Sequence, residues 1–255
     1  MRRGFAAWVL TALLLAGCAA LVPAGTPEEK APTAAEEPEP PRQEVPAAET
    51  PGPPAPEEPA LETPEPADTD FVRVKDYIPE IAVDLRYATA DNFCGQAVYD
   101  FSEAYLRYGT VKKLSAAQEA LAAQGYGLKL WDAFRPVQAQ FTLWEICPDS
   151  RYVADPNRGY SSHSRGNTVD VTLFTASGEE VEMPTGFDDF SALADRDYSD
   201  VADPAAANAQ LLETVMTDAG FQPYFGEWWH FSDMDAYEVA ETPILESEDD
   251  GNAWK

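Results

Sequence analysis

The 255-residue sequence is poor in histidine, cysteine and basic residues, and each scarcity argues against a class of site or partner. It has only two histidines and three cysteines, and the cysteines lack the short spacing of a metal knuckle. Lys and Arg number 17 against 45 Asp and Glu, which gives a net charge of −28. Because nucleic-acid binding needs Lys and Arg to neutralise phosphates, and no basic patch is visible, the sequence argues against a nucleic-acid partner.

The apolar run near the N-terminus is short. It extends from Phe5 to Ala16 after a basic start, too short to span a bilayer comfortably, and it resembles the core of a secretory signal. The run ends in Leu-Ala-Gly-Cys at 15–18, which resembles a bacterial lipobox. We therefore expect residues 1–18 to be a lipoprotein signal peptide with Cys18 as the lipidated residue. The competing interpretation is a buried apolar segment with an incidental cysteine.

The segment 19–70 has the composition of a tether. It contains 14 of the 22 prolines and 13 acidic residues, against only Lys30 and Arg42. Such a segment cannot bury enough apolar surface to offset the entropy lost on ordering, so we predict that it is disordered. We also predict an acidic tail at 246–255, which leaves residues 71–245 as the folded domain.

The folded region mixes strand and helix patterns without repeated βαβ units. Apolar alternation and punctuating Gly and Pro residues predict strands within 81–87, 126–131, 168–175 and 221–231. They also predict helices over 112–124, from 136 to about 146, and from 204 to 219, and a hairpin turn at 177–180. This pattern is typical of an α+β domain with a small antiparallel sheet and flanking helices. Cys94 and Cys147 form a possible disulfide, and two separate buried thiols are the competing interpretation.

Both histidines lie in segments that also carry acidic residues. His163 and Asp170 are seven residues apart, and Glu227 precedes His230 by three. Two His and one Asp, with an open fourth position and a nearby Glu, are the donor set of a catalytic zinc site. The competing interpretation is a capping or surface histidine and a solvated carboxylate. Strand alternation places Asp170 opposite the apolar face formed by Val169, towards a cleft.

Glu227 and His230 pose a geometric problem. In a regular strand, residues three apart face opposite sides of the sheet. If both serve one site, Glu227 must precede the strand or lie at a bend, which Gly226 would make easy.

The two segments, Ser161 to Asp170 and Glu227-Trp228-Trp229-His230, closely resemble the VanX-type D-alanyl-D-alanine dipeptidases. The resemblance extends to 84–93, 125–128 and 131–136, and covers about residues 71–245. It implies a Hedgehog/D,D-peptidase-like fold with one Zn2+ per chain in a central cleft. It also implies zinc-dependent hydrolysis of D-Ala-D-Ala to D-alanine in the bacterial cell envelope.

The resemblance also implies roles for individual residues. The zinc ligands would be His163, Asp170 and His230, and Glu227 would be the catalytic acid/base that moves a proton from the attacking water to the leaving amine. Arg135 would stabilise the oxyanion, although an ion pair with a neighbour such as Asp132 is the competing role.

Four positions would bind the substrate: Tyr87, Asp132, Ser161 and Asp188. Asp188 corresponds to the carboxylate that holds the amine of a dipeptide, with Asp189 as the alternative because the sequence diverges after this point. We expect Trp228 and Trp229 to be core residues or cavity wall.

Other functions stay open at this stage. A related zinc D,D-carboxypeptidase or peptidoglycan endopeptidase would act on longer stem peptides. A non-catalytic zinc or cell-wall-binding lipoprotein, or a tethered interaction protein, would need no Glu227 or Arg135. A lipid anchor would keep the chain outside the cytoplasm at a membrane, where the enzyme would meet envelope dipeptides rather than the cytoplasmic precursor pool.

Overall fold

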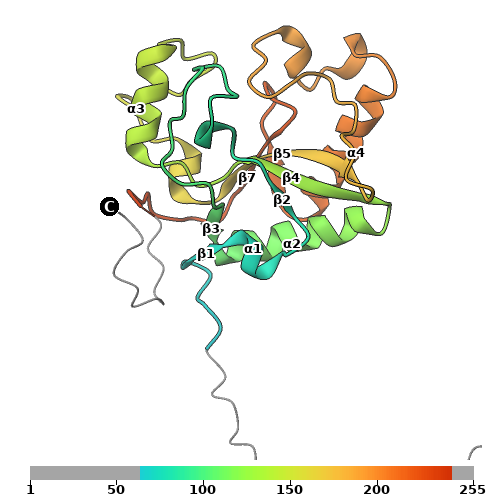
Figure 1. Cartoon of the computed structure of the whole chain (residues 1–255), viewed down its shortest axis with the longest axis horizontal. Helices are drawn as coiled ribbons and strands as arrows, with labels where there is room; N and C mark the ends of the chain where they lie inside the picture. The colour runs from blue at the N-terminus through green and yellow to red at the C-terminus, as the bar shows by residue number, and fades with distance from the viewer. Residues whose placement is uncertain (1–63, 243–255) are drawn as a thin grey trace, which may run out of the picture. The chain divides into compact units, whose positions relative to one another are not determined.

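The computed structural model describes residues 64–242, so the predicted signal peptide, most of the predicted tether and the acidic tail lie outside the described residues. A five-stranded sheet runs through the domain in the order β2-β4-β5-β7-β6 (Figure 1). Its strands are β2 (Ala82–Val83), β4 (Tyr126–Asp132), β5 (Thr168–Thr175), β7 (His230–Asp233) and β6 (Phe221–Pro223). Every pairing is antiparallel except that of β2 with β4. The predicted α+β class is confirmed.

Helices flank this sheet. The helices α2 (Tyr108–Ala122) and α4 (Ala205–Asp218) pack against the sheet and against each other, whereas α3 (Val137–Ile146) stands apart in Figure 1. A second, two-stranded sheet pairs β1 (Phe71–Arg73) with β3 (Tyr105–Arg107), and α1 (Val74–Tyr77) follows β1 directly. None of the helices between residues 64 and 242 is long and apolar enough to span a membrane.

Four short 3-10 turns complete the described elements. They are η1 (Arg86–Ala88), η2 (Ser162–Arg165), η3 (Ala192–Ala194) and η4 (Tyr198–Asp200). Gly166 ends η2 with a φ of 76°, in the left-handed region that favours glycine. The chain therefore turns sharply between His163 and the start of β5.

The register of the three central strands places acidic and imidazole side chains in one row. Asp132 on β4 pairs with Asp170 on β5, and Asp170 pairs with His230 on β7. An irregularity between Leu130 and Asp132 shifts the β4 register just before this row. Because directly opposite residues in antiparallel strands point to the same face, the row carries its side chains to one side of the sheet.

The strand β5 is covered on both faces. Val169, Val171 and Leu173 are at most 1% exposed, as the alternation predicts for the core face. Thr168, Asp170 and Thr172 on the other face are also buried, at 0%, 3% and 5% exposed. The cleft side of the sheet is therefore a shielded environment, in which charges interact strongly.

Two predicted strands are wrong in extent. The segment 81–87 forms only the two residues of β2, because the chain then turns into η1, where the Ala88 amide donates to the Leu85 carbonyl over 3.0 Å. The segment 221–231 divides into β6 and β7, joined by a loop at 224–229. β6 ends at Pro223, and one further hydrogen bond, from the Tyr224 amide to the His230 carbonyl over 3.1 Å, follows before the loop. Glu227 therefore precedes its strand, as its distance from His230 in the sequence required.

The predicted helices and hairpin are present with shifted ends. The helix predicted from residue 112 begins at Tyr108 as α2, and Pro136 and Pro204 precede α3 and α4 rather than belonging to them. In the hairpin after β5, the Thr175 amide donates to the Glu179 carbonyl over 2.9 Å, and Gly178 has a φ of 86°.

Cys94 and Cys147 are free thiols in the structure, so the possible disulfide is not formed. Both are half-buried and pack against the main hydrophobic core. Burial raises the pKa of the Cys94 thiol to about 11, and the nearby carboxylate of Asp188 adds to this effect. Because the thiolate is the reactive form, a thiol held protonated is inert. The competing interpretation, two separate thiols, agrees with the structure.

Candidate active site

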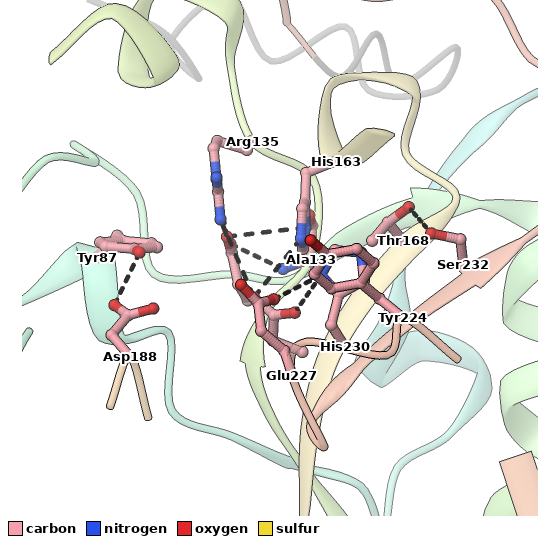
Figure 2. Close-up of polar contacts among 12 residues, drawn as sticks. Tyr87, Ala133, Arg135, His163, Thr168, Asp188, Tyr224, Glu227, His230 and Ser232 are labelled. Carbon is pink, nitrogen blue, oxygen red and sulfur yellow. Dashed lines mark hydrogen bonds and ion pairs between the residues drawn. The ribbon is translucent and has the colours of Figure 1, made fainter. Parts of the chain in front are cut away.

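The side chains of His163, Asp170 and His230 converge on the cleft side of the sheet. Asp170 comes from β5, His230 begins β7, and His163 projects from η2, which lies next to β5 (Figure 2). One ligand atom from each of the three lies within 4.8 Å of the others. His163 and Asp170 are buried, and the His230 side chain is 16% exposed. The three ligands expected from the sequence are therefore brought together in one place.

Hydrogen bonding leaves the expected ligand atoms available. The Nδ1 atom of His163 lies 2.8 Å from the Ala133 carbonyl, which can only accept, so the proton belongs on Nδ1 and the lone pair on Nε2. This Nε2 atom is buried without a hydrogen-bond partner and lies 3.5 Å from Asp170 Oδ2. Asp170 Oδ1 is also without an aligned hydrogen bond, although His230 Nδ1 lies 3.0 Å away.

Orphaned lone pairs in a buried place are costly unless a cation takes them up. Two imidazoles and one carboxylate are the donor types that zinc prefers in catalytic sites, and the carbonyl behind His163 is the usual device that orients such a ligand. The site therefore fits a zinc ion.

The imidazoles control the charge of Asp170. Burial by itself would raise the pKa of this carboxyl, but His163 and His230 act in the opposite direction and hold the pKa below its ordinary value. Asp170 is therefore an anionic ligand, which suits a divalent cation.

The surroundings of Glu227 act in the opposite direction and raise the pKa of its carboxyl. Its Oε2 atom lies 3.5 Å from His230 Nδ1, and its side chain is 25% exposed. Burial, with help from the neighbouring Asp170 and Asp188 charges, raises the pKa of Glu227 to about 7, although His230 and Arg135 lower it. A carboxyl whose pKa lies near neutral pH can both accept and return a proton, which suits general acid–base catalysis.

Arg135 is held rigidly at the edge of this cluster. Its Nε and Nη2 atoms donate to Asp132 Oδ2 over 3.0 and 2.7 Å, and Nη1 donates to Gln140 Oε1 over 2.8 Å. Nη2 also lies 4.0 Å from Asp170 Oδ2. These bonds use three of the five N–H groups of a guanidinium, so donors remain for a ligand in the cavity. Arg135 therefore forms the ion pair with Asp132 that was the competing role considered from the sequence, and it also lines the cavity.

Asp132 does not reach the cavity. Its side chain is fully buried, and its Oδ1 atom accepts hydrogen bonds from the Tyr99 hydroxyl and the Ala133 amide over 2.8 and 2.9 Å. Asp132 is not among the residues that line the cavity. We interpret Asp132 as the residue that orients Arg135, and not as a direct substrate contact.

A cavity of about 320 Å³ opens over the cluster. A volume of this size suits a small ligand. Trp229 lines this cavity. Its walls also include five of the residues expected to act on the substrate, which are Tyr87, Arg135, Ser161, Asp188 and Glu227. Trp228 is instead a core residue whose Nε1 atom donates to Thr185 over 2.9 Å. Trp228 and Trp229 thus divide the two roles expected of them.

Tyr87 and Asp188 form a pair that lies apart from the histidine cluster (Figure 2). The Tyr87 hydroxyl donates to Asp188 Oδ2 over 2.8 Å. Burial raises the pKa of Asp188 to about 7 against the effect of this hydrogen bond, and the nearby Asp170 carboxylate raises it further. Asp188 has a φ of 55°, an unusual conformation that aims its carboxylate at Tyr87 and the cavity. The alternative, Asp189, caps the Ser191 amide and does not line the cavity.

Several residues at the site were not foreseen from the sequence. Tyr152, Tyr160 and Tyr224 line the cavity, and the Tyr224 ring lies 5.7 Å from that of His230. Gln140 and the Ala133 carbonyl orient Arg135 and His163. A backbone carbonyl leaves no trace in the sequence, and Gln140 could have been suspected only from its place on the helix that follows Arg135.

The cavity carries more negative than positive charge at its centre. Asp170, Asp188 and Glu227 line it, and Arg135 is the buried cation among its walls. Burial raises the pKa of Asp188 and the pKa of Glu227, and this excess of negative charge adds to the effect. It also favours cationic ligands, such as a metal ion at the histidines and an ammonium group at Asp188.

Comparison with known proteins agrees with this chemistry. Residues 67–248 match the peptidase family M15, described as D-ala-D-ala dipeptidase. A D-alanyl-D-alanine dipeptidase of Escherichia coli is 35% identical over 177 residues, which cover 69% of this chain and 90% of that protein. A Streptomyces coelicolor protein with the same description is 38% identical, over 64% of this chain and 91% of its own. An Enterococcus faecium protein with the same description is 33% identical, over 63% of this chain and 90% of its own.

The raised pKa of Asp188 predicts a pH effect on the stability of the metal-free protein. The carboxyl has an ordinary pKa near 4 when unfolded and about 7 when folded, so folding favours the protonated form. This stabilisation is complete below about pH 4 and is lost as the pH rises to 7. We expect Asp188→Asn to gain free energy of unfolding relative to the wild type over that range, on the order of 1–3 kcal/mol.

Urea denaturation of the metal-free protein from pH 4 to 8 measures this difference. Asp189→Asn is the matched control, because its carboxylate lies outside the cavity, and it should follow the wild-type curve. A constant difference between Asp188→Asn and the wild type at all pH values would contradict the assignment.

Proposed function

Because this chain belongs to the D-Ala-D-Ala dipeptidase family of M15 peptidases, we propose that it is a zinc metallopeptidase that hydrolyses the dipeptide D-Ala-D-Ala to two molecules of D-alanine. The observation that carries this proposal is the placement of two distinct groups on one small cavity. The His163, Asp170 and His230 cluster forms one part of its wall, and the Asp188 carboxylate forms another. A dipeptide has its free ammonium close to its peptide bond, so both groups can act on one small molecule.

Asp188 supports binding of a free amine. A half-buried carboxylate with a raised pKa is poorly solvated, and an ammonium group would supply the missing counter-charge. A longer peptide would place an uncharged amide nitrogen there and leave the carboxylate without a counter-ion. Asp188 therefore favours a dipeptide over the longer stem peptides that a D,D-carboxypeptidase or endopeptidase would cleave.

The residues that line the cavity have separate roles in the proposed reaction. Asp188, held by the hydrogen bond from Tyr87, binds the substrate ammonium, and Ser161 offers a hydroxyl to the same cavity. Arg135 directs its remaining donors to the oxygen of the scissile carbonyl, where negative charge develops as water adds. Since Asp132 and Gln140 fix the guanidinium beforehand, little reorganisation is needed in the transition state.

Glu227 moves the proton. Its carboxylate takes a proton from the attacking water and then returns it to the nitrogen of the leaving D-alanine as the carbon–nitrogen bond breaks. A pKa of about 7 suits both steps near neutral pH. Zinc, when bound by His163, Asp170 and His230, supplies the Lewis acid that activates water and polarises the carbonyl.

A substrate without the ammonium group tests the assignment of Asp188. We expect the wild-type enzyme to cleave N-acetyl-D-Ala-D-Ala with a kcat/KM about 100- to 1,000-fold below that for D-Ala-D-Ala, because acetylation removes the charge that Asp188 pairs with. Asp188→Asn should lose activity on the dipeptide but discriminate between the two substrates by less than about tenfold.

The measurement is kcat/KM for both substrates with wild type, Asp188→Asn and the matched control Asp189→Asn. The control should discriminate as the wild type does. Equal discrimination by wild type and Asp188→Asn would reject an amine-binding role. Faster cleavage of a stem pentapeptide than of the dipeptide would favour the carboxypeptidase alternative.

We also propose that the chain is a lipoprotein anchored outside the cytoplasm through Cys18, where it would take up or turn over dipeptides of the cell envelope. Support comes from residues 1–18, with their basic start, apolar run and small residues before the cysteine. The composition of residues 19–70 suits a tether between an anchor and the enzyme.

Replacing the lipidated residue tests this location. We expect the full chain to fractionate with membranes in a bacterial host and to incorporate labelled palmitate. Cys18→Ala should lose the label, while Cys94→Ala, the matched control, should retain it. An unlabelled wild-type chain found in the cytosol would overturn the proposal.

A further inference from the structure

The loop 224–229 between β6 and β7 carries Glu227 and leads directly into His230, yet its own backbone holds it weakly. The paired residues of the two strands end at Pro223 and Phe231, beyond which the Tyr224 amide donates to the His230 carbonyl over 3.1 Å. Inside the loop, the two bonds that involve the Glu227 backbone are long, at 3.4 and 3.3 Å. Other parts of the chain must therefore fix the position of Glu227 relative to His230.

Arg196, between η3 and η4, joins the two ends of this loop. Its Nε atom donates to the Tyr224 carbonyl over 2.8 Å, and its Nη2 atom donates to the His230 carbonyl over 3.0 Å. Its backbone amide also donates to the Phe225 carbonyl over 3.0 Å. The side chain is only 5% exposed, and its bond to the His230 carbonyl is partly buried, whereas its bond to the Tyr224 carbonyl lies at the surface.

The far side of the guanidinium is anchored as well. Its Nη1 atom donates to Glu213 Oε2 on α4 over 3.0 Å and to the Tyr198 hydroxyl over 3.3 Å. The group also lies over the Phe231 ring, 4.5 Å from its centre. One planar fork thus connects α4 to both ends of the loop. The compact ammonium of a lysine cannot reproduce this arrangement, although it keeps the charge.

We propose that Arg196 is a positioning residue of this enzyme, which sets the distance between the acid/base Glu227 and the metal ligand His230 by fixing the loop that holds both. This inference rests on the proposed function for the role of Glu227. Arg196 does not line the catalytic cavity, and its hydrogen bonds to the Tyr224 and His230 carbonyls connect it to the loop, so it acts through the loop. Groups that orient metal ligands from behind commonly affect metal affinity and activity by about 10- to 100-fold.

The test compares Arg196→Lys with the wild type in the full chain. We expect the zinc dissociation constant, measured by competition with a chromophoric chelator, to rise about 10- to 100-fold, because His230 is less well oriented. We expect kcat for D-Ala-D-Ala to fall by about 100-fold with KM changed less than about threefold, because Glu227 is displaced while the Asp188 side of the cavity is intact.

Lys113→Met is the matched control for general destabilisation. Lys113 donates to the buried Asp233 carboxylate over 2.5 Å at the opposite end of β7, so the variant loses a buried ion pair on the same strand without touching the loop. Both variants are assayed where circular dichroism shows them folded. We expect the control to lower the thermal midpoint at least as much as Arg196→Lys, with zinc affinity and kcat within about twofold of the wild type.

The proposal would be overturned if Arg196→Lys bound zinc as tightly as Lys113→Met and had a kcat at least as high. A wild-type enzyme that binds zinc but does not cleave D-Ala-D-Ala would reject the proposed function instead. The zinc dissociation constants of the two variants would then still decide whether Arg196 positions His230.

Discussion

The pairing register of three strands is the constraint on which the site depends. Asp132 on β4, Asp170 on β5 and His230 on β7 stand opposite one another in one row of the sheet. Because side chains alternate between faces, a shift of one residue in either pairing would turn one of these groups into the core. Val169, Val171 and Leu173 of β5, each at most 1% exposed, fix this register from the other face. The hydrophobic core therefore fixes the positions of the side chains in this row, although it contributes no metal ligand.

Around this row, the site combines groups held on regular strands with groups held on loops. Asp170 is fixed by its ladder, whereas His163 depends on the Ala133 carbonyl, Arg135 on Asp132, and the Glu227 loop on Arg196. Each loop-borne group thus has a buried partner behind it. Such partners allow a site to be preorganised where the backbone alone would be mobile.

The sequence predicted the residues of the site better than the residues that hold them in position. The scarcity of histidine drew attention to His163 and His230 and to the acidic residues near them, and the resemblance to the D-Ala-D-Ala dipeptidases implied their roles. The fold class followed from periodicity, but the ends of β2 and the split of 221–231 did not, since tertiary turns decide where a short strand stops. The resemblance implied that Asp132 binds substrate, and the sequence could not reveal that its side chain is buried by contacts with residues distant in sequence, such as Tyr99. Arg196 gave no signal, because it acts through backbone carbonyls.

The central claim is that one zinc site and Glu227 together perform peptide hydrolysis in an acidic cavity. The most direct test measures zinc content and D-Ala-D-Ala turnover in parallel for the wild-type chain and for Glu227→Gln, which keeps the size of the side chain but cannot take up the proton. We expect one zinc per chain in both proteins, and a kcat lower by about 100- to 10,000-fold in the variant. Similar turnover by the two proteins, or a wild-type chain that hydrolyses the dipeptide without zinc, would contradict this claim.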